Sequence, residues 1–390
     1  MTILFLTPTY KPAYVYGGVT VVTSLLAESL VKAGHDVTVY TTNGNGSSEL
    51  KVKTGEEILV DGVKVIYFKR YAGGHSHLSP GFWAKTLFNV HHFDIVHIHS
   101  WWSPTIIIAA AICKLRGRIP VLSPHGMFCD YVLNTNNKYK KQLLHAVVGR
   151  SILLNTFLHV STDMEWKESQ AFLKANWTGC IIPNLIESGK NLSPAKKESG
   201  APLIIGFLSR IDRKKGLDVL ISALAEVNFD FRLKIAGSGD QQYIAYLKEL
   251  SKKKNISHKV EWVGWKDNIA KYQFYRSVDL LALISHNENF GVVVLEALSV
   301  GTPVLLSTGV GLSKYVEDNR LGWVLSMSEI ENITQVLEII NDQPQERCRI
   351  GENAPYLIDR DYNTQKITEC YLDFYSRVVE NPLPESEILL

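Results

Sequence analysis

The chain has 390 residues, of which 46% are hydrophobic and 21% are charged, and its formal net charge is +2. This composition excludes a disordered, fibrous or low-complexity protein, and the small net charge offers no broad basic field for a nucleic-acid backbone. Because one hydrophobic core usually stops growing below this length, we expect two domains of about 150 to 200 residues each.

Short apolar runs rich in Val, Ile and Leu alternate with helical stretches, which is typical of parallel strands buried on both faces. In the first half we expect strands at residues 3–7, 36–41, 63–69, 95–99, 120–123 and 158–161. Helical spacing of apolar residues over residues 19–33 predicts a helix after the first strand, with Gly34 as its left-handed cap. Asp61 and Gly62 predict a two-residue hairpin turn at a sheet edge.

A polar segment with Gly and Pro at residues 187–201 predicts a linker between two domains. Beyond it a second doubly wound parallel sheet is expected, with strands at residues 203–208, 232–236, 260–263, 280–285 and 303–307. The stretch 364–379 predicts a helix that has to pack on a surface, and its apolar face carries Ile367, Cys370, Tyr371, Phe374 and Val378.

The first residues enter an apolar strand immediately, without the cationic start and apolar run of a signal peptide. The longest apolar runs fall far short of the roughly 20 residues that span a bilayer. Five widely spaced cysteines match neither a disulfide framework nor a zinc site. We therefore expect a cytoplasmic protein with reduced thiols, whose membrane contact would be peripheral, at the inner face.

The most informative stretch covers residues 285–303 and predicts a strand, a loop, a helix and a strand. Ligands bind at the carboxyl ends of such strands, and a helix that begins near Gly291 would aim backbone N–H groups at a diphosphate. Glu288 in the loop and Glu296 in the helix are good acceptors for sugar and ribose hydroxyls. The helix dipole alone explains Glu288, but it does not explain a carboxylate at Glu296 among apolar residues, so we interpret Glu296 as functional.

Further candidates lie in other loops that follow strands. Arg210 and Lys215 follow the first strand of the second domain and could stabilise a departing nucleoside diphosphate. Gly237 stands in a loop of small residues before a helix, which suits close approach of a ligand. Gly17 and Gly18 occupy the loop after the first strand of the chain, where a glycine can equally be only a turn.

Histidines cluster near strand ends in the first domain. His125 follows a strand and could donate to a sugar hydroxyl, an assignment that depends on the other candidates because a lone histidine is usually structural. His97 and His99 share one strand face but lack a third ligand at metal-binding spacing, so core or cleft lining is expected. Asp359 and Asp361 lie in a late connection and are assigned no metal.

These residues resemble the retaining GT-B glycosyltransferases of family four across almost the whole chain. Two glutamates separated by seven residues, at Glu288 and Glu296, are followed by Ala and then by the sequence Gly-Thr-Pro-Val, as in that family. The resemblance implies an α/β fold of two Rossmann-like doubly wound parallel-sheet domains with an interdomain cleft. Residues 1–186 would form the acceptor-side domain, with a C-terminal helix at residues 364–390 packed back on it, and residues 187–363 the nucleotide-sugar-binding domain.

By the same resemblance, Glu288 contacts the donor sugar, Glu296 the ribose, Arg210 and Lys215 the diphosphate, and His125 lies near the sugar. Backbone amides of residues 289–292 would contact the diphosphate and the sugar, and the segment around Gly264 would line the base. The complete set of further donor-binding candidates is Gly17, Gly18, Gly237, Gly264, Trp265, Asn289, Phe290, Gly291 and Val292.

The predicted function is retaining transfer of a sugar from a nucleotide-diphosphate donor to a hydroxyl of a saccharide or lipid-linked saccharide, in cell-surface polysaccharide or glycoconjugate biosynthesis. No metal or other cofactor is expected. A nucleotide-sugar epimerase of GT-B architecture and a non-catalytic nucleotide-sugar-binding protein are the alternatives. A nicotinamide oxidoreductase is disfavoured because no Gly-x-Gly-x-x-Gly turn follows the first strand.

The acceptor leaves less trace in the sequence. The aromatic residues Trp101, Trp102, Tyr14 and Tyr16 suit either stacking on sugar rings or packing. Residues 137–150 mix lysines with apolar residues, which fits an interfacial helix that presents a lipid-linked acceptor. The same pattern fits an ordinary amphipathic helix that packs on the sheet.

Overall fold

A computed structural model describes residues 1–72, 77–135, 137–187, 202–266, 268–327 and 330–380. The chain divides into two compact units, Met1–Leu185 with Thr364–Leu390, and Ile186–Asn363. The first boundary falls one residue before the expected one, and the second falls where it is expected. The predicted linker lies outside the described residues, apart from Glu187.

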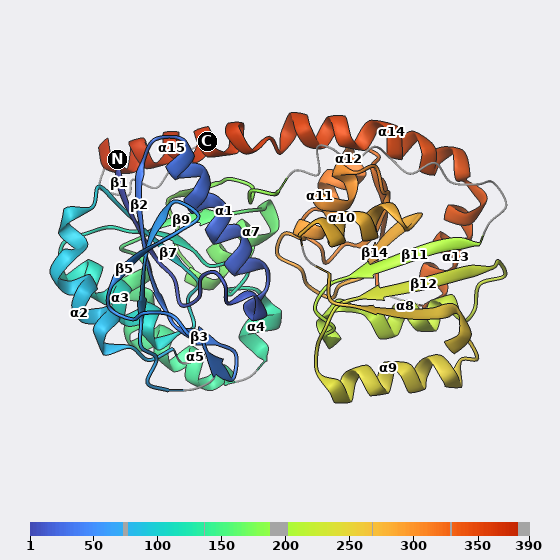
Figure 1. Ribbon diagram of the computed structural model, residues 1–390, viewed down its shortest axis with the longest axis horizontal. Helices are drawn as coiled ribbons and strands as arrows, with labels where there is room; N and C mark the ends of the chain where they lie inside the picture. Colours follow the sequence, from blue (N-terminus) through green and yellow to red (C-terminus); the bar gives the residue numbers. More distant parts are fainter. Residues whose placement is uncertain (73–76, 136, 188–201, 267, 328–329, 381–390) are drawn as a thin grey trace. The chain divides into compact units, whose positions relative to one another are not determined.

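The first unit is built on an eight-stranded sheet with the order β10-β9-β8-β7-β1-β2-β6-β5 (Figure 1). All neighbouring strands are parallel except the edge pair β5 and β6. Its strands are β1 (Thr2–Leu6), β2 (Asp36–Thr42), β5 (Glu57–Val60), β6 (Val63–Phe68), β7 (Ile95–His99), β8 (Val121–Ser123), β9 (Phe157–Val160) and β10 (Gly179–Ile181). A separate pair, β3 (Gly44–Asn45) and β4 (Ser48–Glu49), is antiparallel.

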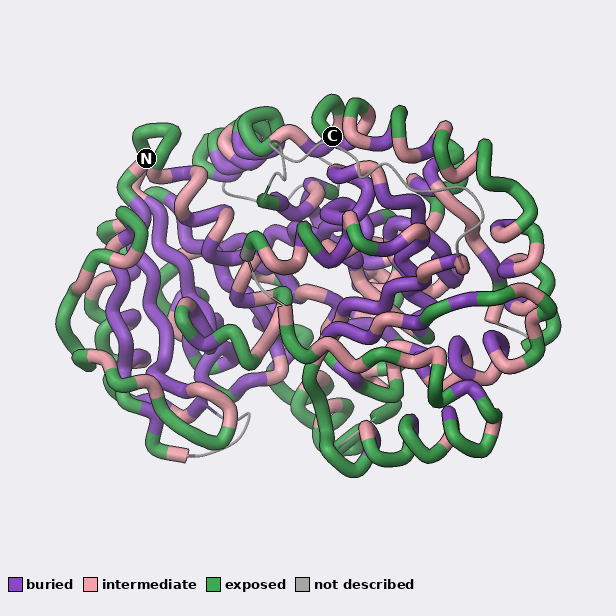
Figure 2. The backbone as a smooth tube through the Cα atoms, turned by 45° about the vertical axis from the view of Figure 1, so that its right-hand side comes forward, coloured by how far each residue is buried: buried purple, intermediate pink, exposed green. Residues whose placement is uncertain are grey.

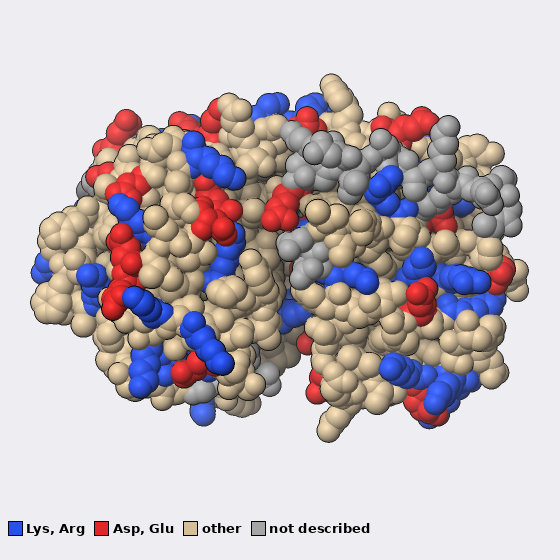
Figure 3. All heavy atoms as spheres, viewed as in Figure 1, with Lys and Arg blue, Asp and Glu red and all other residues tan. Residues whose placement is uncertain are grey.

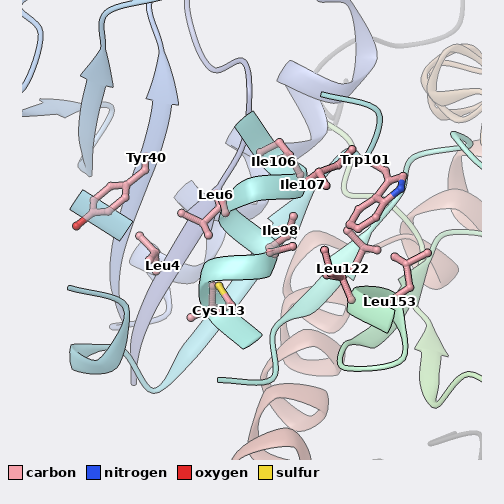
Figure 4. Packing of buried hydrophobic residues seen from close by; sticks show 14 of the residues in the cluster. Leu4, Leu6, Tyr40, Ile98, Trp101, Ile106, Ile107, Cys113, Leu122 and Leu153 are labelled. Atoms are coloured by element: carbon pink, nitrogen blue, oxygen red, sulfur yellow. The ribbon is translucent and has the colours of Figure 1, made fainter. Parts of the chain in front are cut away.

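Helices connect these strands. They are α1 (Gly18–Lys32), α2 (Pro80–Asn89), α3 (Pro104–Leu115), α4 (Asp130–Asn134), α5 (Lys138–Leu144), α6 (Arg150–Leu153), α7 (Asp163–Leu173) and the C-terminal α15 (Thr364–Glu380), with short helices η1 (Tyr14–Tyr16), η2 (Val90–His92) and η3 (His145–Gly149). Leu4, Leu6, Ile98 and Leu122 of the sheet pack with α3 in one core (Figure 4). The parallel strands of this sheet are buried along almost their whole length, as alternation with covering helices predicts, whereas the antiparallel edge strand β5 is partly or fully exposed (Figure 2).

Local signals in the first half predicted this unit well. The hairpin turn joins β5 and β6 at the sheet edge, and Asp61 and Gly62 both have positive φ, at 50° and 85°. Gly34 ends α1 with a φ of 88°. The short strands β3, β4 and β10 were missed, because two or three residues carry too little apolar pattern to be recognised.

The second unit has a six-stranded, all-parallel sheet with the order β13-β12-β11-β14-β15-β16. Its strands are β11 (Leu203–Leu208), β12 (Phe231–Ala236), β13 (Val260–Gly264), β14 (Leu280–Leu283), β15 (Val304–Ser307) and β16 (Gly322–Leu325), the last of which was not predicted. Its helices are η4 (Arg213–Lys215), α8 (Leu217–Leu224), α9 (Gln241–Lys253), η5 (Ser257–Lys259), α10 (Asn268–Arg276), α11 (Val292–Ser299), α12 (Ser313–Asp318), α13 (Ile330–Asp342) and α14 (Pro344–Asp361).

The C-terminal helix α15 contacts α1 and β7 of the first unit. Four of the five predicted core positions are buried, but Cys370 is exposed and its assignment to the core face is wrong. Tyr375 is buried in its place. The buried face of α15 therefore includes Tyr375 and not Cys370. The apolar pattern does not reveal this, because the hydroxyl of Tyr375 is buried against a polar partner, His97 of β7.

The strand order places the candidate loops. In the first sheet, successive strands are added on one side of β1 up to β6 and then on its other side from β7 onward, so the strand order switches between β1 and β7. In the second sheet the same switch lies between β11 and β14. Loops after such neighbouring strands open at the carboxyl edge of the sheet, where doubly wound folds bind ligands. Each unit therefore has one switch point. Gly17, Gly18, Arg210, Lys215 and Glu288 follow the strands beside it, whereas His125, Gly237 and Trp265 follow the more distant strands β8, β12 and β13.

Candidate functional site

Lys215 and Glu288 meet at the switch point of the second unit. Lys215 ends η4 after β11, and Glu288 lies between β14 and α11. The ammonium group of Lys215 forms a hydrogen-bonded ion pair with the carboxylate of Glu288, and the two side chains are 11% and 21% exposed. The structure thus brings together the cation and the acid that the sequence analysis placed on two separate loops.

Backbone contacts hold these two loops against each other. His286 donates its N–H to the carbonyl of Lys214 at 2.9 Å. Gly216 has a φ of 65°, and a Cβ at that position would lie 1.9 Å from the carbonyl oxygen of Ile284. Only glycine fits so close an approach, so Gly216 allows Lys215 to reach Glu288.

The backbone of Glu288 is also fixed by the loop after β15. Its N–H donates to the carbonyl of Gly309 at 2.8 Å, and its own carbonyl accepts from Gly311 at 2.8 Å. The following Gly291, at φ 88°, is the N-cap of α11, where the sequence predicted a helix to begin. Val292 is the first residue of that helix, and Asn289 precedes the cap.

Phe290 points into the core of the second unit. It is buried, and its ring centroid lies 6.3 Å from that of Tyr362 in an edge contact. Its side chain is therefore committed to packing, which leaves only backbone groups for the donor contact that the family resemblance implies.

Glu296 has structural partners that the sequence analysis did not foresee. It is 4% exposed, and its two oxygens accept from Nζ of Lys271 at 2.6 Å and from the hydroxyl of Tyr275 at 2.7 Å. The interpretation of Glu296 as functional is therefore not needed to explain its burial, because α10 supplies both a cation and a hydroxyl. The signal was present as Lys271 and Tyr275, which are four residues apart and therefore share one face of α10.

The charges around Lys271 reinforce that pairing. Burial alone would lower the pKa of Lys271, but the carboxylates of Glu296 and Glu187 outweigh it and hold the pKa above its ordinary value. Burial, with the carboxylate of Glu296, raises the pKa of Tyr275 well above its ordinary value. Lys271 is thus held as a cation and Tyr275 as a neutral hydroxyl donor.

The other cations of the β11 loop behave differently. Arg210 is exposed, and within the described residues no hydrogen bond or ion pair joins its side chain to Lys215 or Glu288. Arg213 lies with its guanidinium 4.8 Å from the ring centroid of Tyr243 and 5.7 Å from that of Tyr246. The side chain of Arg213 is therefore engaged by the aromatic rings of α9.

Gly237 is required by backbone packing. A Cβ at this position would lie 2.0 Å from the carbonyl oxygen of Ser209, so the ligand-approach interpretation is not needed to explain the glycine. Its N–H donates to the carbonyl of Gly264 at 3.0 Å. Gly264 has a φ of 71° with no atom within 4 Å of an added Cβ, and the adjacent Trp265 is exposed.

The glycine loop of the first unit follows β1. Gly17, with a φ of 75°, is the N-cap of α1, and Gly18 is the first helical residue. A Cβ at Gly18 would meet nothing within 4 Å, so backbone packing does not demand glycine there. Nearby, Tyr14 is exposed, whereas the hydroxyl of Tyr16 accepts from the N–H of Gly46 at 2.9 Å.

His125 stands in a tight turn after β8. It has a left-handed φ of 53°, followed by Gly126 at 75°. Its Nε2 lies 3.1 Å from Nδ1 of His99, and the N–H of Gly126 donates to a carboxylate oxygen of Glu165 at 2.6 Å. Burial lowers the pKa of His125 to about 3. Glu165 was missed, although Thr162 and Glu165 form the capping pattern that begins α7.

A directed chain of hydrogen bonds links β7, β8 and β9 to α15. His159 Nε2 donates to the carbonyl of Ile182 at 2.9 Å, which leaves Nδ1 to accept from the hydroxyl of Ser123 at 2.6 Å. Ser123 then accepts from Nε2 of His97, and Nδ1 of His97 accepts from the hydroxyl of Tyr375, both at 2.6 Å. Burial lowers the pKa of His97 well below its ordinary value and that of His159 to about 4, which keeps both rings neutral.

Comparison with known proteins assigns the family. The sequence model described as Glycosyltransferase Family 4 matches residues 16–161, and that described as Glycosyl transferases group 1 matches residues 190–356. The chain belongs to the group 1 glycosyltransferases and has the GT-B fold. Both units that carry the clustered residues are thus glycosyltransferase domains.

Relatives and solved structures agree with this assignment. An uncharacterized glycosyltransferase of Methanocaldococcus jannaschii is 27% identical over 83% of this chain and 85% of its own length. Sucrose-phosphate synthase from Thermosynechococcus elongatus superimposes with a TM-score of 0.76 at 18% identity, covering 97% of this chain and all of the other. Anabaena HepE in complex with UDP and glucose gives 0.75 at 18% identity, covering 96% and 99%.

Four aromatic residues of this glycosyltransferase were candidates either for stacking on sugar rings or for packing, and the structure shows how exposed each one is. Trp101 is fully buried, so it packs in the core. Trp102 is partly buried and donates from its indole nitrogen to the carbonyl of Met127 at 2.8 Å. Of the four candidates, only Tyr14 keeps a substantially exposed ring.

The segment at residues 137–150 of the glycosyltransferase is not an ordinary amphipathic helix. It forms α5, the π-helical η3 and the start of α6, and its apolar side chains Tyr139, Leu143 and Val147 are 83%, 67% and 69% exposed. The hypothesis that its apolar residues pack on the sheet is therefore wrong for these side chains. No described helix is long and apolar enough to cross a bilayer.

Proposed function

We propose that this glycosyltransferase moves a hexosyl residue from a nucleoside-diphosphate sugar to a hydroxyl of a saccharide or lipid-linked saccharide, with retention of anomeric configuration and without a metal ion. The pairing of Lys215 with Glu288 at the switch point of the second unit supports this proposal most directly. It places a cation for phosphate beside a carboxylate for sugar hydroxyls, next to the first turn of α11.

The pair has complementary tasks when a donor binds. The ammonium of Lys215 would turn from Glu288 to the diphosphate oxygens and stabilise the negative charge that develops as the nucleoside diphosphate leaves. Glu288 would then accept hydrogen bonds from donor sugar hydroxyls, since a carboxylate accepts several. Arg210, whose guanidinium is exposed, would add a planar fork of donors to the same diphosphate.

Retention follows in this proposal from attack on the face from which the leaving group departs. The bond between the anomeric carbon and the phosphate oxygen breaks, and a bond from that carbon to the acceptor oxygen forms. The acceptor proton passes to a phosphate oxygen of the leaving group. Neither Glu288 nor Glu296 serves as a covalent nucleophile, and His125 donates a hydrogen bond to the sugar.

The remaining candidates would bind the nucleoside. Glu296 keeps acceptor capacity beyond Lys271 and Tyr275, because each carboxylate oxygen has more than one lone-pair site, so it can still receive a ribose hydroxyl. The open turn at Gly264 and the exposed Trp265 would line the base. Because Anabaena HepE was solved with UDP and glucose, a uridine donor is the first to test.

A membrane-proximal acceptor is part of the same proposal, with the enzyme at the cytoplasmic face and its product in a cell-surface polysaccharide or glycoconjugate. Residues 80–156 contain eight Lys and Arg but only two acidic residues, so this segment carries +6 in a chain whose net charge is +2. Acidic and basic side chains are intermixed over the face shown in Figure 3, so an excess of basic over acidic side chains is not typical of that face. The exposed apolar side chains of α5 and η3 lie within this basic segment, a combination that suits an anionic bilayer surface.

A two-stage experiment tests the proposed function. A thermal-shift panel of UDP, GDP, ADP and dTDP sugars identifies the donor, because a ligand of the native state raises the melting temperature. The selected donor is then incubated with and without saccharide acceptors, and products are analysed by mass spectrometry and by NMR of the anomeric centre. Acceptor-dependent transfer with retention and with a chelator present supports the proposal. Epimerised free donor, or binding without turnover, would refute it.

A further inference from the structure

His99 and His125 form a contact whose proton has to reside on one of two atoms. Nδ1 of His99 and Nε2 of His125 lie 3.1 Å apart, and their ring planes are inclined by only 11°. Burial lowers the pKa of His99 well below its ordinary value and that of His125 to about 3, so both rings are neutral near pH 7. One neutral ring must donate to the other.

The surroundings of His99 decide the direction. Its other ring nitrogen, Nε2, is buried and has no hydrogen-bond partner among the described residues. If His125 donated, His99 would carry its only proton on that Nε2, as a buried N–H without an acceptor. If His99 donates from Nδ1, its Nε2 carries only an unpaired lone pair. Buried N–H groups without an acceptor are rarer in proteins than buried acceptors without a donor, so donation by His99 is favoured.

We infer that His99 is a positioning residue that holds His125 in the Nδ1–H tautomer, so that His125 presents a fixed N–H donor rather than a base. The Nε2 lone pair of His125 is occupied by His99, and its proton is on Nδ1. The identity of the group that receives this N–H rests on the proposed function, in which it is a hydroxyl of the donor sugar.

Glu165 fixes the backbone that carries His125. One of its oxygens accepts from the N–H of Gly126 at 2.6 Å, and the other accepts from the N–H of Ser161 at 2.9 Å. His125 and Gly126 are both left-handed, and for a non-glycine residue this conformation has to be imposed by its surroundings. A buried carboxylate that grips the next peptide supplies that constraint, so both the turn and the ring are set before a ligand binds.

Nitrogen-15 NMR of the full-length protein tests the tautomer directly. Long-range proton–nitrogen spectra at neutral pH distinguish a protonated from a bare ring nitrogen, and the His125→Gln variant identifies the resonances of His125 by their absence. We expect protonated Nδ1 and bare Nε2 at His125. The opposite pattern, or rapid exchange between the two forms, would overturn the inference.

Kinetics of two variants separate the hydrogen bond from ring packing. His99→Asn keeps an N–H donor close to the place of Nδ1, whereas His99→Phe keeps a ring and removes the donor. We expect His99→Phe to lower kcat about tenfold with little change in KM for the acceptor, and His99→Asn to recover most of that loss. Equal losses in the two variants would contradict the donor role.

The NMR result does not depend on sugar transfer. A wild-type protein that transfers no sugar refutes the proposed function and leaves the tautomer assignment standing. A wild-type protein that transfers sugar while His125 is protonated on Nε2 refutes the inference alone. Melting temperatures of both His99 variants show whether a kinetic loss reflects unfolding.

Discussion

Lys215 and Glu288 are 73 positions apart in the sequence and form an ion pair in the structure. Their loops follow β11 and β14, the two neighbouring strands at which the order of the second sheet reverses. Gly216 lets the first loop pass against the end of β14, and Gly309 and Gly311 fix the backbone of Glu288. Two strand-end loops thereby place opposite charges together at the carboxyl edge of the sheet.

Replacement of either partner is expected to abolish most of the turnover. In the proposed function, Lys215→Ala removes the cation that stabilises the leaving group, and Glu288→Gln removes the charged acceptor for sugar hydroxyls. We expect kcat to fall at least about 100-fold in each, in the range found when one transition-state donor is removed. Initial rates with saturating donor and acceptor measure this.

Lys253→Ala is the matched control for Lys215, because Lys253 is an exposed cation at the end of α9. Its turnover should equal that of the wild type. Circular dichroism and melting curves show whether the Lys215 and Glu288 variants remain folded. Undiminished transfer by a folded Lys215→Ala protein would remove the proposed role of this residue.

The ion pair between Glu296 and Lys271 predicts a loss of stability. Its side chains are 6% and 13% exposed, so Glu296→Gln leaves the charge of Lys271 buried without its main partner. We expect the free energy of unfolding to fall by about 3 kcal/mol or more in urea titrations. The double variant Glu296→Gln with Lys271→Met should recover much of this loss, because no charge is then stranded.

Ribose binding can be tested with the same proteins. Glu249→Gln, an exposed carboxylate on α9, serves as the control for stability. Weaker UDP binding by a stable double variant than by wild type would support a contact between Glu296 and the nucleoside, in addition to the contact between Glu296 and Lys271. Unchanged UDP affinity in the stable double variant would leave Glu296 with its structural role alone.

The sequence predicted the sheets better than the contacts inside them. Strands such as β7 and β11 agree with their predicted bounds to the residue, because buried parallel strands are continuous apolar runs between turn residues. The same periodicity misplaced Cys370, since an apolar face seen in one helix does not show where the polar groups of other strands lie. Tyr375 is buried because its hydroxyl reaches His97 on β7, 278 positions earlier in the chain.

Site residues in loops after strands were recoverable, because topology alone sends those loops to one edge. Lys215 and Glu288 were selected as candidates in this way, and the structure brings them together. Glu165 and Lys271 were not, because each sits inside a helix and has a partner that is distant in sequence, the N–H of Gly126 for Glu165 and the carboxylate of Glu296 in α11 for Lys271. A helical carboxylate or lysine looks like a solvent-facing charge until the tertiary structure supplies its partner.

The buried histidines predict acid sensitivity. The pKa of His159 is lowered from 6.5 to about 4 and that of His97 is also lowered, so below pH 6.5 the unfolded chain binds more protons than the folded protein. Stability is therefore full above pH 6.5 and falls as the pH drops toward about 4. Each histidine contributes a slope of up to about 1.4 kcal/mol per pH unit.

Urea titrations between pH 7 and pH 4 measure this slope. His159→Gln should be less stable than wild type at pH 7 but should show a shallower decline, since one titrating group has been removed. The exposed His258 offers the control, and His258→Gln should retain the wild-type slope. A His159→Gln protein whose stability declines as steeply as wild type would show that other groups control the acid transition.

The basic and apolar surface of α5 and η3 predicts binding to anionic lipid. Co-sedimentation with phosphatidylcholine vesicles, with and without phosphatidylglycerol, measures it. Lys138 and Lys140 are exposed, and since a surface cation contributes about 1 kcal/mol of attraction, the Lys138→Glu and Lys140→Glu double variant should bind at least about 30-fold more weakly.

Leu143→Asp should weaken binding to both vesicle types. Tyr356→Asp changes an equally exposed aromatic residue of α14 and should have no effect. If wild-type protein binds no better to vesicles with phosphatidylglycerol than to vesicles without it, the proposed acceptor at an anionic bilayer is contradicted. Saccharides that carry no lipid would then be the acceptors to test in the transfer assay.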